Sequence, residues 1–203
     1  MAIRALFSTL VYRAPLARPA SPRFAQTLAD ECRALAASDT AGQRWSQRNY
    51  LGGYTSYGSL DRLHLVSSVF ASLGKRLDPH VRAFARRLDY DLGGRSLAMT
   101  DCWVNVMPAG VVHSLHLHPT SFISGTYYVA VPMGAGALKF EDPRLSRMMA
   151  APPRRAHVSL PAKAGEVILF ESWLRHEVPP ARYAGERVSV SFNYAWAPAA
   201  RRC

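Results

Sequence analysis

Cysteine is scarce in this chain of 203 residues. Cys32, Cys102 and Cys203 are odd in number, far apart and without CxxC spacing. That pattern argues against a disulfide framework and against a cysteine zinc site, and it suits a reducing compartment. Long apolar runs are also lacking, because proline or glycine interrupts each one before it reaches the length of a membrane span. We therefore expect a soluble, cytoplasmic protein with no membrane segment.

Acidic residues are absent from the first 23 positions, which contain several arginines, so a transit peptide has to be considered. The segment lacks the hydrophobic core and the cleavage site of a signal peptide. Residues 6–12 are better interpreted as a first β-strand that belongs to the fold.

The chain has only three lysines. Its formal net charge is +11, so arginine supplies most of the positive charge. The arginines are scattered, and the closest groupings are the pairs at 86–87, 154–155 and 201–202. Nucleic-acid binding depends on a concentrated basic patch, so we do not expect nucleic acid as a partner. With 49% hydrophobic and 19% charged residues the composition is that of a globular protein, and the length suits one domain.

The chain changes character near residue 96. Before it, Ser21-Pro22 is a typical helix start, with a capping side chain followed by proline, and helical spacing continues to Leu35. We expect a surface loop at residues 42–58, a second helix at 60–77, and a third helix that begins at Asp78-Pro79 and ends near residue 92. Residues 1–95 would thus supply a strand and supporting helices, residues 96–197 the core, and residues 198–203 a tail.

The core segment is rich in short strand patterns separated by turn residues. They lie at residues 97–107, 111–118, 124–131, 137–140, 156–160, 166–170, 175–178 and 187–195. Eight short strands in about 100 residues predict a double-sheet jelly roll or a related barrel. We therefore expect a single, mainly β domain with its N-terminal helices packed on the outer face of one sheet.

Alternation in the last strand indicates which face is buried. Arg187, Ser189 and Ser191 alternate with Val188, Val190 and Phe192. If the polar side lines the barrel interior, the apolar side has to be covered from outside. The helices of residues 1–95 are the obvious cover.

Three histidines form the most informative pattern. His116 and His118 are two apart on a predicted strand, so both can face one metal ion, and His176 could close the set from a later strand. His113 would face the other way on a regular strand, and we expect it to bond locally. Imidazole suits iron, zinc, copper and nickel, so ligand type alone does not name the metal.

The charged residues near these histidines have different predicted roles. Glu177 would point away from a metal bound by its neighbour His176, while Glu141 and Asp142 follow a strand as alternative carboxylate ligands. Arg187 lies on a buried strand, and a buried guanidinium requires an anion. Its fork-shaped donors match a carboxylate, and Ser189 can donate from the same face.

At these residues the chain resembles the 2-oxoglutarate- and Fe(II)-dependent dioxygenase superfamily, and within it a little-characterised bacterial family of 2OG-Fe(II) oxygenases. The resemblance covers nearly all of the chain. Its motifs lie at residues 6–7, 11–12, 103–105, 116–119, 124–129, 140–144, 165–170, 172–178 and 187–193.

The resemblance implies a double-stranded β-helix with Fe(II) near one open end and 2-oxoglutarate as co-substrate. It assigns His116 and His176 as metal ligands, with His118 where the superfamily has Asp or Glu. It assigns Arg187 to the far carboxylate of 2-oxoglutarate, with Ser189 as helper. Tyr128 and Asn105 are further candidates for this pocket.

The implied activity uses O2 to hydroxylate an unidentified small-molecule or carrier-bound substrate, with release of succinate and CO2. A neutral third ligand leaves the iron centre one charge unit more positive and puts ordinary hydroxylation in question. Halogenation is disfavoured, because that variant opens the third ligand position and His118 fills it.

Two alternatives stay open. A cupin-like three-histidine dioxygenase without 2-oxoglutarate explains the histidines, as does a non-enzymatic zinc-binding jelly roll. Neither gives Arg187 and Ser189 a role. The sequence leaves the substrate and the oligomeric state open, and the tyrosine-rich loop at 42–58 could be a pocket wall or could pack against the domain.

Overall fold

The computed structural model describes residues 3–16, 21–144, 146, 149 and 154–197. The predicted tail at 198–203, with Cys203, lies outside the described residues. The elements in chain order are β1 (Val11–Pro15), α1 (Pro22–Ser38), α2 (Thr40–Asn49), β2 (Tyr54–Thr55), α3 (Leu63–Val66), α4 (Ser68–Arg87), β3 (Leu97–Pro108), β4 (His113–His116), β5 (Ile123–Ala130), β6 (Leu138–Glu141), β7 (His157–Leu160), β8 (Glu166–Glu171), β9 (His176–Val178) and β10 (Glu186–Trp196).

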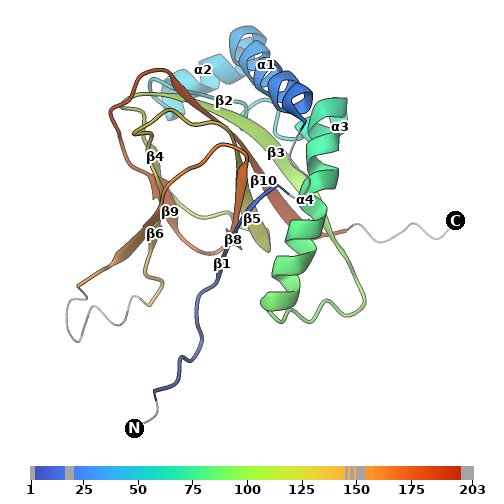
Figure 1. Ribbon diagram of the computed structural model, residues 1–203, viewed down its shortest axis with the longest axis vertical. Helices are drawn as coiled ribbons and strands as arrows, with labels where there is room; N and C mark the ends of the chain where they lie inside the picture. The colour runs from blue at the N-terminus through green and yellow to red at the C-terminus, as the bar shows by residue number, and fades with distance from the viewer. Residues whose placement is uncertain (1–2, 17–20, 145, 147–148, 150–153, 198–203) are drawn as a thin grey trace, which may run out of the picture.

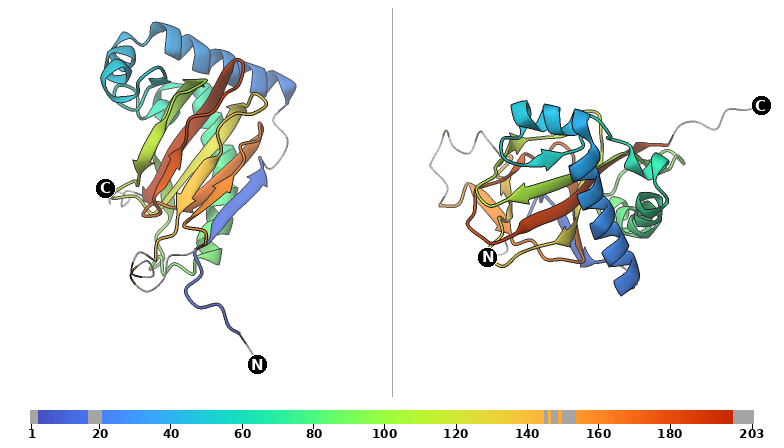
Figure 2. Two further views of the ribbon diagram at one scale, coloured as in Figure 1. Left: turned by 90° about the vertical axis from the view of Figure 1, so that its left-hand side faces the viewer. Right: turned by 90° about the horizontal axis from the view of Figure 1, so that it is seen from above.

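The strands form two antiparallel sheets. The larger has the order β1-β8-β5-β10-β3-β2 and the smaller has the order β4-β9-β6-β7. Figure 1 shows the smaller sheet on the side of the larger one that faces away from α4. Figure 2 shows α1 crossing one end of the strands. The expected mainly β jelly roll with N-terminal helices is confirmed.

The first helix follows its sequence signals. The Ser21 hydroxyl accepts a hydrogen bond from the Phe24 backbone N–H, and Pro22 begins the helix. The prediction of two separate helices at 60–77 and 78–92 was wrong, because α4 runs unbroken through Pro79. Pro79 and Lys75 are both exposed, so the backbone carbonyl that proline leaves unpaired faces water. Burial of Leu77, Val81 and Phe84 along one face keeps the helix continuous.

Two other boundaries also differ from expectation. Residues 40–49 form α2 rather than a loop, because the Asp39 side chain caps the helix by accepting from the Gly42 N–H. The first strand begins at Val11 and not at residue 6, since its pairing with β8 starts at Val11. Leu6 and Phe7 are exposed.

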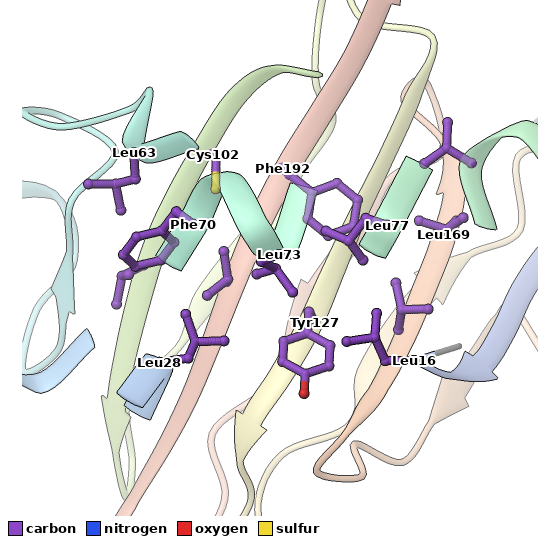
Figure 3. Packing of buried hydrophobic residues seen from close by; sticks show 14 of the residues in the cluster. Leu16, Leu28, Leu63, Phe70, Leu73, Leu77, Cys102, Tyr127, Leu169 and Phe192 are labelled. Atoms are coloured by element: carbon purple, nitrogen blue, oxygen red, sulfur yellow. The ribbon is translucent and has the colours of Figure 1, made fainter. Parts of the chain in front are cut away.

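One hydrophobic cluster fills the space between the helices and the larger sheet. Figure 3 shows Phe70, Leu73 and Leu77 of α4 lying over Cys102 of β3 and Phe192 of β10. All five side chains are 0% exposed. None of the described helices is long and apolar enough to cross a bilayer.

A second cluster lies between the two sheets. Its buried members are Tyr50, Met107, Val111, Tyr128, Leu138, Phe140, Ile168, Phe170, Leu174 and Val178. The alternation of β10 assigns Val188, Val190 and Phe192 to the helix side, as expected. Arg187 and Ser189 line a cavity on the other side, between the sheets.

Candidate metal centre and adjoining pocket

Three histidines meet at one end of the smaller sheet. His116 is the last residue of β4 and pairs in register with His176, the first residue of β9. His118 lies just beyond the end of β4, where its backbone N–H donates to the Ser172 carbonyl. One ring nitrogen from each histidine lies within 4.8 Å of the others.

Hydrogen bonds orient two of these rings. Nδ1 of His116 lies 2.6 Å from the Ser114 carbonyl oxygen, and Nδ1 of His176 lies 2.9 Å from the Leu174 carbonyl oxygen. Because a carbonyl only accepts, each Nδ1 is the protonated donor, and Nε2 is left with its lone pair. Metal-ligating histidines show this arrangement, in which a backbone carbonyl fixes the tautomer.

The spacing of the ligand atoms suits a metal ion. Nε2 of His118 and Nε2 of His176 are 3.3 Å apart. Two nitrogens on metal bonds of about 2.1 Å stand roughly 3.0 Å apart at a right angle and roughly 3.4 Å apart at a tetrahedral angle. The donor set therefore fits a first-row metal ion.

A polar chain supports His118 from behind. The Asn193 side chain acts on the His118 ring to raise its pKa, against the larger effect of burial, and its Nδ2 donates to Asp101 at 3.2 Å. The Asn193 Oδ1 accepts from Ser124 at 2.8 Å. A carboxylate thus lies one residue behind the histidine that occupies the position of a carboxylate ligand.

Burial keeps the histidines neutral. Desolvation lowers the pKa of His176 to about 2, with His116 as the next cause. Desolvation lowers the pKa of His118 to about 4, again reinforced by His116. Neutral imidazoles are the metal-binding form, so the cluster is ready to bind a cation at neutral pH.

The alternative carboxylates have other partners. Glu177 pairs with Lys139 at 2.8 Å, and Glu141 pairs with Arg175 at 2.8 Å. Asp142 pairs with Arg144 at 2.7 Å. The described part of the chain therefore brings no carboxylate into the three-histidine group, and the prediction that Glu177 points elsewhere agrees with its ion pair.

His113 does not face away, and that prediction was wrong. A bulge between His113 and His116 in the pairing with β9 turns both side chains to the same face. Their rings stack with centroids 4.5 Å apart and an interplanar angle of 11°. Desolvation lowers the pKa of His113 to about 3, and His116 and Arg187 act in the same direction.

Arg187 shares a cavity with the histidines. It is 3% exposed, and its Nη1 donates to the Met107 sulfur at 3.2 Å. Its Nε has no partner among the described residues. No carboxylate in the described ranges lies within ion-pair distance of it. A buried guanidinium without a counter-charge is costly, so this one is suited to receive an anion.

The other candidates for this pocket gather around Arg187. Its guanidinium carbon lies 5.0 Å from the centroid of the Tyr128 ring. Ser189 is 2% exposed and pairs with Asn105 on β3 and with Tyr128 on β5. The Tyr128 hydroxyl and the Asn105 Oδ1 are buried without a hydrogen-bond partner in the described structure.

Sequence reasoning missed a further hydroxyl in this region. The Tyr50 ring contacts His113 with centroids 5.2 Å apart, and its OH is buried without a described partner. Burial raises the pKa of Tyr50, and the nearby Arg187 opposes that rise. Gly53 permits this placement, because a Cβ there would lie 2.7 Å from the Tyr50 ring. The signal available was a tyrosine-rich segment with two glycines, whose partner in space the sequence does not identify.

A larger pocket of about 420 Å³ adjoins the metal centre. His113, His116 and His118 line both this pocket and the cavity between the sheets that contains Arg187, called the inner cavity below. Trp45, Tyr50 and Tyr57 from the segment at 42–58 form part of its wall, whereas Tyr54 packs in the helix-side core. The segment therefore forms part of a pocket wall and also packs against the domain, which are the two roles that the sequence left open.

The fold and the histidine cluster define a jelly-roll protein with a candidate metal centre between its sheets. Residues 101–193 match the family described as "Putative 2OG-Fe(II) oxygenase". This segment, which is less than half of the chain, is similar to that family, in agreement with the resemblance seen in the sequence. No curated protein matches the chain.

Solved structures agree on the fold. A Pseudomonas putida prolyl-4-hydroxylase is 19% identical with a TM-score of 0.61, over 94% of this chain and 95% of that one. HygX from Streptomyces hygroscopicus, solved with nickel and 2-oxoglutarate bound, is 14% identical with a TM-score of 0.64, over 92% and 83%. The carbocyclase SnoK from nogalamycin biosynthesis, described as α-ketoglutarate dependent, is 14% identical with a TM-score of 0.65, over 95% and 84%.

Proposed function

We propose that this protein is an Fe(II)- and 2-oxoglutarate-dependent dioxygenase. His116, His118 and His176 hold the metal, and Arg187 binds the far carboxylate of 2-oxoglutarate. The observation that carries the proposal is a 3% exposed arginine without a counter-charge among the described residues, in the cavity that the three histidines also line. Ser189, Tyr128 and Asn105 complete the recognition of that carboxylate.

The residues of the chain divide the work. The three neutral imidazoles direct lone pairs at the cation, and Asn193, which donates to Asp101, lies beside the His118 ring. Arg187 supplies the fixed positive charge that selects a dicarboxylate. The bound iron and co-substrate would supply the oxidising chemistry, which hydroxylates a substrate carbon and releases succinate and CO2.

The inner cavity is narrow, with a volume of about 30 Å³. Binding of a five-carbon dicarboxylate therefore requires the lining side chains to move apart. Arg187 is suited to such a movement, because the contact to the Met107 sulfur that holds it is weak.

The third histidine distinguishes this centre from one with a carboxylate ligand. Three neutral ligands leave Fe(II) with one more unit of positive charge. Asp101 places a negative charge one residue behind His118 and offsets part of that difference. Of the alternatives, a cupin-like dioxygenase without 2-oxoglutarate and a zinc-binding jelly roll both leave Arg187 buried without a role.

We infer a small-molecule or carrier-bound substrate that reaches the metal through the pocket of about 420 Å³. That volume lies in the usual range for small-molecule sites. The buried free thiols of Cys32 and Cys102 suit a reducing compartment such as the cytoplasm.

The decisive experiment is an anaerobic titration of the Fe(II)-loaded protein with 2-oxoglutarate. The visible metal-to-ligand charge-transfer band should appear in the wild type and fail to develop in Arg187→Ala. Iron bound without any band would favour the three-histidine chemistry that needs no 2-oxoglutarate. Metal analysis showing zinc, with no iron taken up, would favour the zinc-binding jelly roll.

A further inference from the structure

The pocket beside the metal centre has an electrostatic character opposite to that of the chain. The chain has a net charge of +11, yet the described residues that line this pocket include two aspartates, Asp61 and Asp101, and no lysine or arginine. A second cavity of about 420 Å³, beside α4, is lined by three arginines, Arg82, Arg86 and Arg95, and one aspartate, Asp78. The positive charge of the protein therefore lies elsewhere, and the opening to the metal is acidic.

Asp61 is held at this pocket by its backbone. Its carbonyl oxygen accepts a hydrogen bond from the Cys102 N–H at 2.6 Å, and the adjacent Arg62 forms a β-bridge with Cys102. Among the described residues, the Asp61 carboxylate has no hydrogen-bond or ion-pair partner. That carboxylate is thus positioned in the pocket lining and remains available to a ligand.

Asp101 presents a second carboxylate, with one oxygen already used. Its Oδ2 accepts from Thr100 Oγ1 at 2.7 Å and from Asn193 Nδ2 at 3.2 Å. Both donors are neutral, so the negative charge of Asp101 is not cancelled by them. Two carboxylates in one pocket, neither with an ion-pair partner among the described residues, favour a positively charged ligand.

Aromatic rings complete the wall. Tyr57 lies between Trp45 and Trp103, with ring centroids 6.1 Å and 5.2 Å away. Trp103 in turn stacks on His118 at 5.7 Å, so the aromatic row leads directly to the metal centre. Aromatic faces attract ammonium groups, and the attraction is stronger when the site is partly desolvated.

From this juxtaposition we propose that the pocket binds a small-molecule substrate through an ammonium group. The cation lies between Asp61, Asp101 and the aromatic row, and the carbon chain extends toward His118 and the metal. The proposal deepens the dioxygenase assignment and rests on it, because it takes this pocket as the substrate site. The arginine-lined cavity beside α4 provides the contrast within the molecule, since it would favour an anion.

The test compares three probes of equal chain length and different charge. Pentylammonium, pentanol and pentanoate are titrated into the anaerobic protein loaded with Fe(II) and 2-oxoglutarate, and tryptophan fluorescence is recorded. Trp45 and Trp103 line the pocket and serve as local reporters. We expect pentylammonium to bind at least about tenfold more tightly than pentanol, with pentanoate weakest.

A matched pair of variants separates specific binding from general attraction. Asp61→Asn keeps the shape of the side chain and should remove most of the preference for pentylammonium over pentanol. Asp30→Asn changes an exposed aspartate on α1 and should leave that preference unchanged. Adding Asp101→Asn to Asp61→Asn should abolish the preference, and circular dichroism checks that each variant is folded.

The outcomes distinguish the two proposals. Equal binding of pentylammonium and pentanol, tighter binding of pentanoate, no saturable response to pentylammonium, or an unchanged preference in Asp61→Asn would each overturn the substrate class. If those results accompany a normal 2-oxoglutarate band, the dioxygenase assignment survives. Absence of the band in the wild type would instead overturn the dioxygenase assignment.

Discussion

The two faces of the larger sheet bury different kinds of side chain, and strand β10 contributes to both faces. On β10, Val190 and Phe192 face the helices and are 0% exposed in an apolar cluster. On the opposite face Arg187 and Ser189 are almost equally buried, at 3% and 2%, but they line a cavity. Burial is therefore alike on the two faces, and what differs is whether the buried groups have partners.

Unpaired polar atoms are concentrated on the inner side. Two of the six described buried side-chain atoms without a hydrogen-bond partner are Nδ1 of His64 and Oε2 of Glu141. The other four are the hydroxyls of Tyr50 and Tyr128, Oδ1 of Asn105 and Nε of Arg187. All four residues lie at or beside the cavity between the sheets. A buried polar atom without a partner lowers the stability of the fold unless a ligand forms a hydrogen bond with it. We therefore assign stabilisation of the fold to the helix side of the larger sheet and ligand binding to the inner side.

The largest effect should come from the helix side. Phe192→Ala removes a fully buried ring that packs on Tyr194 and over Gly125, and it should lower the free energy of unfolding by about 3–5 kcal/mol. Chemical denaturation measures this loss. Phe192→Leu should lose much less, and folded Phe192→Ala should retain the 2-oxoglutarate affinity of the wild type. A fall in that affinity would show that the helix side of the sheet also contributes to 2-oxoglutarate binding.

Arg187→Met should show the reverse pattern. Loss of the guanidinium should weaken 2-oxoglutarate binding by about 2–5 kcal/mol. Stability should hold or rise, because an unpaired buried charge is replaced by an apolar side chain. Anaerobic titration and chemical denaturation measure the two quantities, and Arg182→Met, at an exposed position, is the matched control. Strong destabilisation by Arg187→Met would mean that the arginine belongs to the structural core.

The pH dependence of the metal-free protein should report chiefly the histidines of the inner side. Burial also lowers the pKa of His64 and His80 on the helix side, and these two contribute to the slope as well. The folded-state pKa values of His176, His113 and His118 are lowered to about 2, 3 and 4, below the ordinary value of about 6.5. The unfolded chain therefore binds more protons below about pH 6.5, and stability is lost as the pH falls toward these folded-state values. Each fully titrating histidine contributes at most about 1.4 kcal/mol per pH unit.

Denaturation in chelator between about pH 7 and about pH 5 tests this slope. His176→Ala should reduce the slope, whereas Phe192→Leu should lower stability at every pH without changing it. A flat profile in the wild type would show that the histidines become protonated in the folded protein.

The smallest effect concerns one hydroxyl. Tyr50→Phe preserves the ring contact with His113 and removes an OH that has no described partner and lies near Arg187. It should weaken 2-oxoglutarate binding by about 1 kcal/mol, roughly fivefold, with little change in stability. Tyr54→Phe is the control, because its OH donates to Asp39 at 2.9 Å on the helix side. Tyr54→Phe should lose stability and keep its affinity for 2-oxoglutarate. An unchanged 2-oxoglutarate affinity in Tyr50→Phe would show that the Tyr50 hydroxyl does not contribute to binding.

Local patterns in the sequence predicted much of this arrangement. Period-two alternation in residues 187–192 assigned the two faces of β10, and Ser21-Pro22 located the start of α1. The spacing of His116 and His118 predicted that their side chains converge, although the strand itself ends at His116. These features depend on neighbouring residues, so a linear sequence contains them.

Tertiary structure decided the remainder. The bulge that turns His113 toward His116 depends on how β4 pairs with β9, more than fifty residues away. Pro79 continues a helix because an entire apolar face is buried on the sheet, which outweighs the lost hydrogen bond. Tyr50 reaches the vicinity of Arg187 only because Gly53 leaves room for its ring.

The sequence by itself therefore determined the jelly-roll class, the three histidines and the buried arginine, because strand periodicity and residue chemistry are local properties. Only the folded chain decided which groups are left without partners and which charges surround the opening to the metal. Asp61 and Asp101 are forty residues apart and have no common motif, and backbone contacts across the fold place both in one pocket.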